Sequence, residues 1–521
     1  MKRLFSLLMI AAASFPVLAE GALTAEQETA IRNIERAIAL TDATWKGSIK
    51  GQTDNLYMAD TYNVRTGATS GPSDVWPYTA AIEAHNSILE ALEAAKDIAP
   101  DLYDKNYEKY KTNLDKLIDN LEWYRGSYVL PSYAVSKEVN PYAVPRAAQR
   151  NGADCTGILN VYDDQMWLSR ELIRAYKLTG NEAYLKDATY LADYALEGWD
   201  CWRDANGEEY GGITWGPGYN SKHACSNGPI IQPLVWLSEI YTPTDETMEY
   251  YYRDRDNKVV QETVARGDHY LNFAKKVYDW QKKNLKHESG VYWDMMGADN
   301  TINVADGYRQ HMDCGGPTGA LISYNTGTMI SGGADLYKMT NDPVYLEDIE
   351  AATKASLNNF SKYDRKTGRY QFNTDKTAEQ GFTTWFNDVL MRSYADAYPL
   401  VEGSASKNGL ESFQGNLDYG YENNLKNGLL PIHLMEGWGD EKITKGFHQF
   451  SFASQYAVLA NWLLEKAKAS KAGVASPVAE KTNNKTVYTL SGVNKGEYTN
   501  VKDSLPRDIY IVGGEKMICG K

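Results

Sequence analysis

The stretch LYKMTNDPVYLEDIEAATKASLNNF, residues 336–360, echoes an earlier stretch, AYKLTGNEAYLKDATYLADYALEGW, residues 175–199. Each reads as the end of one helix, a short polar turn and a second helix. A helical hairpin cannot bury its apolar face alone, so repeated hairpins must stack to share a core. The repeat therefore predicts an all-α fold built from helical hairpins.

Helical periodicity extends over most of the chain up to residue 469. About twelve segments carry it, and they begin near residues 24, 74, 103, 162, 182, 229, 261, 319, 342, 381, 408 and 447. Twelve helices make six hairpins, which either close into an (α/α)6 toroid or continue as an open solenoid. We predict the closed toroid, which would create one funnel-shaped site where the inner helices begin.

A short glycine–aromatic stretch recurs between these helices. It appears as GGITW around Gly212, SGVYW around Gly290 and TGRYQF around Gly368, with successive glycines 78 residues apart. We expect these stretches to form short β-like links at one end of the ring.

The N-terminus has the pattern of a signal peptide, residues 1–19. Lys2 and Arg3 precede an apolar run that ends in small residues at Ala19. We expect cleavage after Ala19 and export to the periplasm, the cell surface or the medium. We expect no lipid anchor, because no cysteine lies near the cut, and no membrane span, because no later stretch has about 20 apolar residues.

The pattern changes after the last helical segment. We assign residues 20–469 to the helical domain, residues 470–485 to a small, polar linker and residues 486–521 to a small β module. Within that module, KTVYTLSGV and RDIYIVGGEKMI alternate as strands do. About forty residues bury little core, so the module is either a β appendage packed on the main domain or a separate signal.

Composition narrows the function. The 521 residues carry a formal charge of −14, which disfavours a nucleic-acid partner, and they include 38 Tyr and 13 Trp, which suit a neutral sugar. No CxxC pair or cluster with metal-ligand spacing is present, so we expect no metal and no cofactor. We also expect the protein to be a monomer. The cysteine count is odd and leaves at least one thiol unpaired; a Cys201–Cys225 bridge is one option.

Two adjacent aspartates, Asp163 and Asp164, stand at the front of the helix that begins near residue 162. A structural interpretation makes Asp163 the helix cap and Asp164 a partner of the helix dipole. A cap needs one carboxylate, however, and two carboxylates a few ångströms apart repel and divide their roles. Glycosidic cleavage needs that division between a proton donor and a second carboxylate.

Aromatic and small polar residues accompany the pair. Trp167 follows one turn later, and the loop YGGITWGPGYNSKHACSNGPIIQ, residues 210–232, supplies Trp215, Lys222 and Asn227. Stacking faces beside small polar groups suit a pyranose. Lys222 either binds a sugar hydroxyl or is an ordinary exposed lysine.

Further candidates follow the starts of other helices and links. Trp76 forms either a wall of the site or part of the core, and Asn325 is a candidate for binding a sugar hydroxyl. Asp294 and Asp299 either bind substrate or cap a turn. Tyr324, beside Asn325, is included among the candidates for substrate binding.

Four motifs occur in an order that resembles glycoside hydrolase family 76, the endo-α-1,6-mannanases. They are YDDQMW, GGITW, SNGPIIQ and YNTGTMISGGADLYKMTND, residues 324–342, and the resemblance covers most of residues 70–465. It implies an (α/α)6 barrel and a retaining mechanism. By the same resemblance, Asp163 is the nucleophile and Asp164 the general acid/base.

The resemblance implies an exported enzyme that cleaves internal α-1,6-mannosidic bonds of α-mannan, as in yeast cell walls. One alternative is a mannan transglycosylase, because a sugar hydroxyl can replace water in the second step of a retaining reaction. Another is a non-catalytic carbohydrate-binding protein, which the intact aspartate pair disfavours.

The tail has a resemblance of its own. Residues 488–492, YTLSG, and the later stretch 509–516 are similar to the C-terminal sorting modules of proteins exported by type IX secretion. This resemblance covers the tail alone and implies a role in destination.

Overall fold

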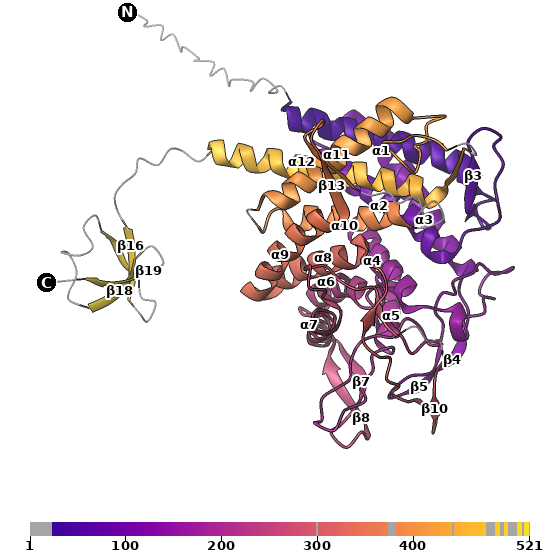
Figure 1. The fold of residues 1–521 in the computed structure, drawn as a ribbon, viewed down its shortest axis with the longest axis vertical. Coiled ribbons are helices and arrows are strands. Elements are labelled where there is room, and N and C mark those ends of the chain that lie inside the picture. Colours follow the sequence, from indigo (N-terminus) through magenta and orange to yellow (C-terminus); the bar gives the residue numbers. More distant parts are fainter. Residues whose placement is uncertain are drawn as a thin grey trace, which may run out of the picture. The chain divides into compact units, whose positions relative to one another are not determined.

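The structure is a computed structural model (Figure 1). It describes residues 23–297, 301–372, 382–401, 403–439, 442–475, 485–489, 494–498, 508–512 and 515–519. The predicted signal peptide lies outside these residues. The chain divides into two compact units, Met1–Leu464 and Glu465–Lys521.

The first unit is an (α/α)6 toroid, which confirms the predicted fold class. Outer and inner helices alternate along the chain. The outer helices are α1 (Ala25–Ser48), α3 (Pro100–Asp119), α5 (Glu182–Leu196), α7 (Arg266–Leu285), α9 (Pro343–Phe360) and α11 (Ser404–Asn424). The inner helices are α2 (Val75–Ala95), α4 (Tyr162–Thr179), α6 (Ile231–Tyr241), α8 (Ser323–Thr340), α10 (Thr383–Ala397) and α12 (Gly446–Ala475).

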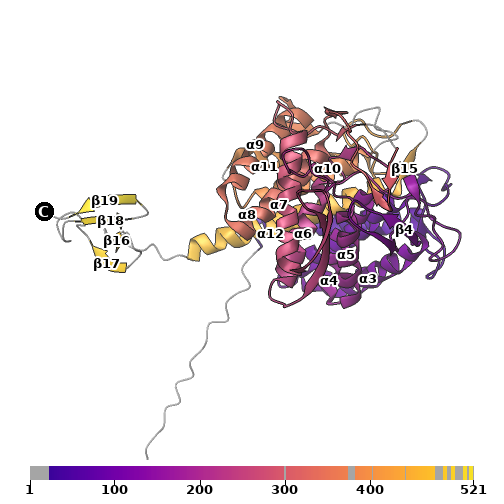
Figure 2. The ribbon, with the colours of Figure 1, turned by 90° about the horizontal axis from the view of Figure 1, so that it is seen from below.

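Burial separates the two sets of helices. Residues 323–336 of α8 are all buried, as befits a helix surrounded by others. By contrast, α9 buries a single stripe that includes Tyr345, Ile349 and Ala352, at the three- and four-residue spacing of one helix face. Figure 2 shows α6, α7 and α8 side by side, and α6 packs on both of the others.

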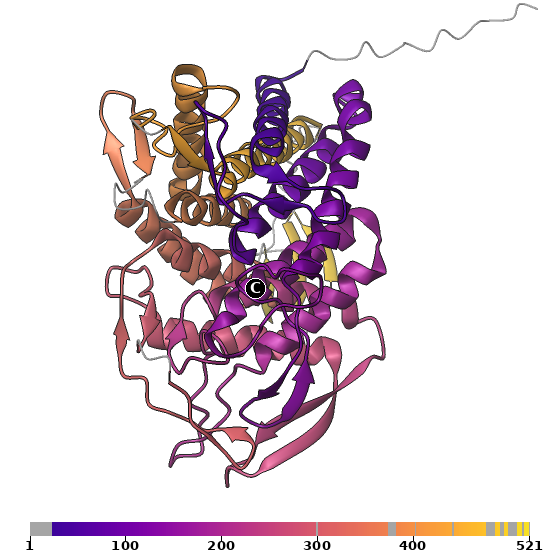
Figure 3. The same cartoon turned by 90° about the vertical axis from the view of Figure 1, so that its right-hand side faces the viewer.

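The ring closes where the first helix meets the last two. Arg36 of α1 pairs with Asp418 of α11 at 2.6 Å, and Asn33 of α1 donates to Gln414 of α11 at 2.6 Å. Figures 1 and 3 both show the indigo helix α1 beside the orange and yellow helices of the C-terminal third. The open solenoid is therefore excluded.

The repeated hairpins share one turn design. Helix α4 ends at Gly180, with φ of 69°, and Asn181 caps α5 by accepting from the Ala183 backbone N–H. Helix α8 ends at Asn341, with φ of 56°, and Asp342 caps α9 in the same way. A left-handed residue followed by an Asx cap reverses the chain in both hairpins.

The glycine–aromatic stretches form β-like links, as predicted. Gly212, Gly290 and Gly368 all have positive φ, of 78°, 88° and 68°. Gly212 precedes the bridge between Trp199 and Ile213, and Gly368 lies in the hairpin of β13 (Ser361–Asp364) and β14 (Arg369–Phe372). Each link leads from an outer helix toward the next inner helix and carries the chain to the end where the inner helices begin.

Other links contain strands as well. A sheet of order β12-β9-β6 joins β6 (Lys222–His223), β9 (Met295–Met296) and β12 (Pro317–Thr318) beside the site. Further pairs are β1 (Ile49–Lys50) with β2 (Tyr57–Met58), β3 (Thr61–Asn63) with β15 (Ile443–Lys445), β4 (Tyr128–Pro131) with β5 (Ser136–Val139), and β10 (Val304–Ala305) with β11 (Tyr308–Arg309). Three 3₁₀ turns are η1 (Asn120–Trp123), η2 (Gly157–Leu159) and η3 (Gly228–Ile230).

The predicted helix starts lie within five residues of those observed. The start near residue 261 was too early, because α7 begins at Arg266. Residues before it belong to a hairpin of β7 (Thr247–Arg253) and β8 (Val259–Ala265) that the sequence analysis did not anticipate.

A belt of buried polar contacts links the inner helices below the site. Glu83 of α2 pairs with Arg392 of α10 and accepts from Ser454 of α12, and Asn86 of α2 donates to Glu171 of α4 at 2.9 Å. The belt continues through α6 and α8.

In that second half, Gln232 of α6 receives the Arg170 Nε–H of α4 at 3.4 Å and donates to Asp335 of α8 at 2.9 Å. Ser331 of α8 donates to Asp396 of α10 at 2.7 Å. All six inner helices therefore take part.

The second unit contains a four-stranded antiparallel sheet of order β17-β16-β18-β19. Its strands are β16 (Lys485–Thr489), β17 (Asn494–Tyr498), β18 (Asp508–Val512) and β19 (Glu515–Cys519). The predicted β structure of this module is confirmed, whereas its packing on the main domain and its role in sorting stay predictions. Helix α12 extends to Ala475, into the predicted linker, and residues 476–484 lie outside the described part.

Two further observations concern membrane-spanning helices and disulfide bonds. In the part of the chain that the structure describes, no helix is long and apolar enough to cross a membrane. Cys155, Cys201, Cys225 and Cys314 are unbridged, so the Cys201–Cys225 option is not realised.

Candidate active site

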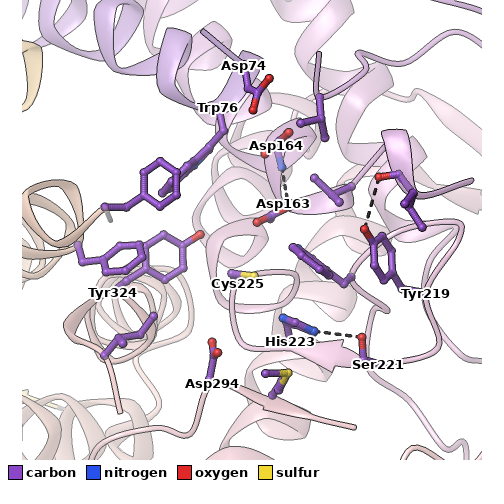
Figure 4. A pocket seen from close by; sticks show the side chains of 18 of the residues that line it. Asp74, Trp76, Asp163, Asp164, Tyr219, Ser221, His223, Cys225, Asp294 and Tyr324 are labelled. Carbon is purple, nitrogen blue, oxygen red and sulfur yellow. Dashed lines mark hydrogen bonds between the residues drawn. The ribbon is translucent and has the colours of Figure 1, made fainter. Parts of the chain in front are cut away.

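A cavity of about 710 Å³ opens where the inner helices begin (Figure 4). Its walls come from the first turns of α2, α4, α8 and α10 and from the loops that precede α6 and α8. The lining residues are Asp74, Trp76, Pro77, Val144, Ile158, Val161, Asp163, Asp164, Trp215, Tyr219, Ser221, His223, Cys225, Asp294, Met295, Ile322, Tyr324, Phe382 and Phe386.

The aspartate pair occupies the second and third positions of α4. Val161 is the N-cap residue and makes no side-chain cap, so Asp163 is not the cap. Its carboxylate instead accepts the backbone N–H of Asp164 at 3.1 Å. Figure 4 shows both carboxylates at the centre of the cavity. The partial positive charge of the α4 N-terminus favours negative charge at this place.

Burial and mutual repulsion separate the two carboxyl groups. Burial raises the pKa of Asp163 to about 6, although the nearby Cys225 thiol and Trp215 indole lower it. Burial raises the pKa of Asp164 well above its usual range, and the charges of Asp163 and Asp74 raise it further. The groups titrate as a coupled pair in which Asp163 loses its proton first. This pair can hold one charge and one proton near neutral pH.

Asp74 is a third carboxylate on the same wall, and the sequence analysis missed it. It is the N-cap residue of α2, yet its side chain makes no cap hydrogen bond. Figure 4 shows its carboxylate turned toward the cavity, next to Asp164. An aspartate at the start of a predicted helix is interpreted as a cap, so only its position two residues before Trp76 hinted at another role.

Aromatic rings form two sides of the cavity. Trp76 lies flat on Trp385, with ring centroids 4.5 Å apart and 3° between the planes, and is itself half-buried. It is therefore a wall of the cavity supported by the core. On the other side, Trp215 stacks on His223 with centroids 4.6 Å apart, and Tyr219 packs on Trp215 at 4.5 Å.

His223 is held neutral beneath Trp215. Burial lowers the pKa of His223 to about 4, and its Nε2 lies 3.0 Å from the Ser221 hydroxyl. The sequence analysis passed over His223 and Cys225, although both lie in the loop that it singled out. Phe382 and Phe386, which precede and open α10, were also missed.

Asp294 reaches the cavity from the link that follows α7. Burial raises its pKa, and the Asn325 side chain lowers it. Asn325 is itself fully buried outside the cavity lining, where its Nδ2 donates to the Trp293 carbonyl at 3.3 Å. Asp299 lies outside the described residues.

Two other predicted binding residues hold the loops in place. The Lys222 ammonium is buried and pairs with Asp200 at 2.9 Å, so it is not an exposed lysine. Asn227 is also buried; its Oδ1 accepts from the Ile213 N–H at 2.8 Å and its Nδ2 donates to the Ile213 carbonyl at 2.9 Å. Neither side chain lines the cavity.

Trp167 lies behind the wall. It is 2% exposed, and its indole N–H donates to the Tyr324 hydroxyl oxygen at 2.6 Å. Tyr324 lines the cavity and separates Trp167 from it. The spacing of one turn correctly predicted that Trp167 lies on the side of α4 that faces the cavity. It did not show that Tyr324 lies between Trp167 and the cavity.

Within the described residues, no group of three or more His, Cys, Asp or Glu side chains has the arrangement of a metal site. The expectation that the protein uses no metal or cofactor stays a prediction. The cavity combines four carboxylates with aromatic walls, which suits acid–base chemistry on a neutral, hydroxyl-rich ligand.

The chain is also similar to known proteins. Residues 263–421 match the model of glycosyl hydrolase family 76. A family 76 mannosidase from Bacteroides thetaiotaomicron shares the fold with a TM-score of 0.59 at 18% identity, over 84% of this chain and 100% of the other. The α-1,6-mannanase of a Salegentibacter species gives 0.55 at 20% identity, over 82% and 99%.

Among curated sequences, the mannan endo-1,6-alpha-mannosidase DCW1 of Candida glabrata is 25% identical over 195 residues. That alignment covers 37% of this chain and 36% of the relative, so the match spans about a third of each. The family model thus matches about a third of this chain, and the solved structures share its fold.

Proposed function

We propose that the protein is a glycoside hydrolase that cleaves internal α-1,6-mannosidic bonds of α-mannan with retention of configuration. The observation that carries the proposal is the Asp163–Asp164 pair at the centre of an aromatic-walled cavity. In the Salegentibacter α-1,6-mannanase, an inactive variant with two consecutive aspartates replaced binds α-1,6-mannotetrose. A pair of consecutive aspartates in the same fold is the feature that both proteins share.

The order in which the two carboxyl groups lose their protons supports a division of roles. Asp163 ionises first, so it is the nucleophile that attacks the anomeric carbon. Asp164 keeps its proton longer, so it protonates the leaving oxygen and afterwards takes a proton from the incoming water. The electron pair of the Asp163 carboxylate forms the bond to carbon while the glycosidic bond breaks.

The remaining lining residues bind the sugar. A cavity of about 710 Å³ lies within the range of roughly 300–1,000 Å³ typical of small-ligand pockets. Trp76 and Trp215 offer flat apolar faces, and Asp294 and Tyr324 offer hydrogen bonds to hydroxyl groups. Trp167, Lys222, Asn227 and Asn325 support these residues from behind.

Product analysis with linear α-1,6-mannan tests the proposal. We expect the wild-type protein to release short oligosaccharides, and proton NMR of the earliest products to show the α anomer. Inverted products would exclude the retaining mechanism, transfer products would favour a transglycosylase, and binding without cleavage would make the protein a lectin.

Two variants test the roles. Asn keeps the shape of Asp but removes the charge or the proton, so Asp163→Asn and Asp164→Asn should each lower activity on mannan by several orders of magnitude. An aryl α-mannoside with a good leaving group needs no acid, so it should restore the first step in Asp164→Asn alone. Restoration in Asp163→Asn alone would exchange the roles.

We also propose that the protein is exported after removal of residues 1–19, which its N-terminal pattern supports. N-terminal sequencing of the secreted protein should start at Glu20. A mature protein that retains Lys2 and Arg3 would contradict export by this route.

A further inference from the structure

One hydrogen bond joins the helix of the catalytic pair to the opposite wall of the cavity. The Trp167 indole N–H of α4 donates to the Tyr324 hydroxyl oxygen of α8 at 2.6 Å. Trp167 lies one turn after the aspartates and is hidden from the cavity, whereas Tyr324 lines it. Figure 4 shows the Tyr324 hydroxyl directed toward Asp163.

This hydrogen bond determines where the Tyr324 hydroxyl proton can point. An indole N–H is only a donor, so the Tyr324 oxygen must accept from it and cannot return its own proton along the same line. Within the described residues, no protein atom accepts the Tyr324 proton. Burial and the neighbouring Cys225 and Asp163 raise the pKa of Tyr324 well above its usual range, so the hydroxyl stays a donor.

Trp167 is held rigidly enough to serve as an anchor. Its ring lies 6.3 Å from that of Trp385, and the guanidinium groups of Arg392 and Arg170 lie 5.2 and 5.6 Å from its centroid. Both arginines belong to the polar belt, so the belt fixes the indole and the indole fixes the phenol.

We propose that Tyr324 is a catalytic hydrogen-bond donor to an oxygen of the sugar beside Asp163, and that Trp167 is a positioning residue that aims this proton. The inference rests on the proposed function and deepens it by adding a residue pair to the same site. It replaces the prediction that Trp167 stacks on the substrate.

A double-mutant cycle tests the coupling between the two residues. Tyr324→Phe should lower kcat on α-1,6-mannan about tenfold with little change in KM, because a preorganised donor acts mainly in the transition state. Trp167→Phe keeps a ring but loses the N–H, and should lower kcat roughly three- to tenfold. In the Tyr324→Phe background, Trp167→Phe should have almost no further effect on kcat.

Trp385→Phe is the matched control. Trp385 is as deeply buried, lies beside Trp167, and its indole N–H has no hydrogen-bond partner among the described residues. Its substitution should lower the melting temperature about as much as Trp167→Phe does. Its effect on kcat should be the same with and without the Tyr324 hydroxyl.

A spectroscopic measurement tests the bond without a Trp167 variant. The indole N–H resonance of Trp167 should move upfield in Tyr324→Phe, while that of Trp385 should not. Additive losses of kcat in the cycle, or an unchanged Trp167 resonance, would overturn the inference in an active enzyme. A wild-type protein that is inactive on α-1,6-mannan would instead overturn the proposed function, and the inference with it.

Discussion

Helix α4 carries carboxylates in two places, two turns apart, and their surroundings are opposite. Asp163 and Asp164 open the helix with no cationic partner among the described residues, and their pKa values are raised. Glu171 lies deeper, with the Arg174 guanidinium 2.9 Å away, and its pKa is lowered despite complete burial. A carboxylate whose charge is compensated by arginines holds the inner helices of the toroid together. A carboxylate without such compensation is available for chemistry.

The belt also contains carboxylates whose pKa is raised, and Asp388 is one that supports this distinction. Asp388 is fully buried, and burial together with the charge of Glu83 raises its pKa well above its usual range, although Arg392 lowers it. A neutral Asp388 leaves the Arg392–Glu83 pair undisturbed. Unlike Asp164, it does not line the cavity, so its proton has no substrate to reach.

The largest expected effect on stability comes from removing the charge of Glu171, which the neighbouring arginines compensate. Glu171→Gln leaves Arg170 and Arg174 buried with one carboxylate fewer, which should lower the free energy of unfolding by about 3–5 kcal/mol. The pKa of Glu171 is lowered in the folded state, so its stabilisation is present above its unfolded pKa and is lost as pH falls.

Chemical denaturation at several pH values checks this prediction. The difference between wild type and Glu171→Gln should be largest at neutral pH and should shrink below about pH 4.5, near the unfolded pKa of glutamate. A variant as stable as wild type at pH 7 would contradict the structural role of the belt.

Sequence patterns identified the fold and the centre of the site for physical reasons. Helical period and the hairpin repeat are local properties, so the twelve helix starts could be found without contacts. The adjacent pair at Asp163 and Asp164 was visible because one helix start rarely needs two carboxylates.

What the sequence could not give depends on distant partners. Lys222 and Asn227 have residue types that suit sugar binding, but Asp200 and the Ile213 backbone engage them first. Trp167 meets Tyr324 across 157 residues of chain. Asp74 has the sequence signature of a cap, and only the structure shows that its side chain makes no cap hydrogen bond.

Two tryptophans extend the comparison to apolar residues. Trp215 lines the cavity, whereas Trp236 donates to Asp335 of the belt at 2.8 Å. Trp215→Ala should lower kcat/KM roughly tenfold through lost stacking, worth on the order of 1–1.5 kcal/mol, and change the melting temperature little. Trp236→Ala should do the reverse. Equal losses of activity in both variants would mean that Trp215 is only a core residue.

A smaller effect on stability is expected from removing one of the two uncompensated carboxylates at the start of α4. The pKa of Asp164 is raised in the folded state, so its ionisation opposes folding once the pH exceeds the unfolded value near 3.9. Asp164→Asn should therefore raise the melting temperature, on the order of 1–3 °C at pH 7. Calorimetry should show this gain growing as the pH rises from 4, the opposite of the trend for Glu171. A loss of stability at pH 7 would show that the carboxylate is compensated after all.

The smallest effect concerns Asp74, whose charge adds to the repulsion that keeps Asp164 protonated. Burial raises the pKa of Asp74 itself, the charge of Asp60 raises it further, and Lys445, which lies 3.5 Å from Asp60, lowers it. The alkaline limb of the kcat/KM profile reports loss of the Asp164 proton, and the acidic limb, near pH 6, reports ionisation of Asp163.

Asp74→Asn removes one negative charge beside Asp164 and should lower the pKa of that group, so the alkaline limb should move to lower pH. The acidic limb should move less, because Asp74 is not among the main causes of the Asp163 shift. Asp294→Asn is the control: it removes a carboxylate from the opposite wall, which is not among the causes of the Asp164 shift. It should lower kcat/KM through lost binding while leaving both limbs in place. Movement of the alkaline limb in Asp294→Asn but not in Asp74→Asn would show that the first turn of α2 does not tune the acid. The absence of a cap hydrogen bond from the Asp74 carboxylate would then be explained by substrate binding alone.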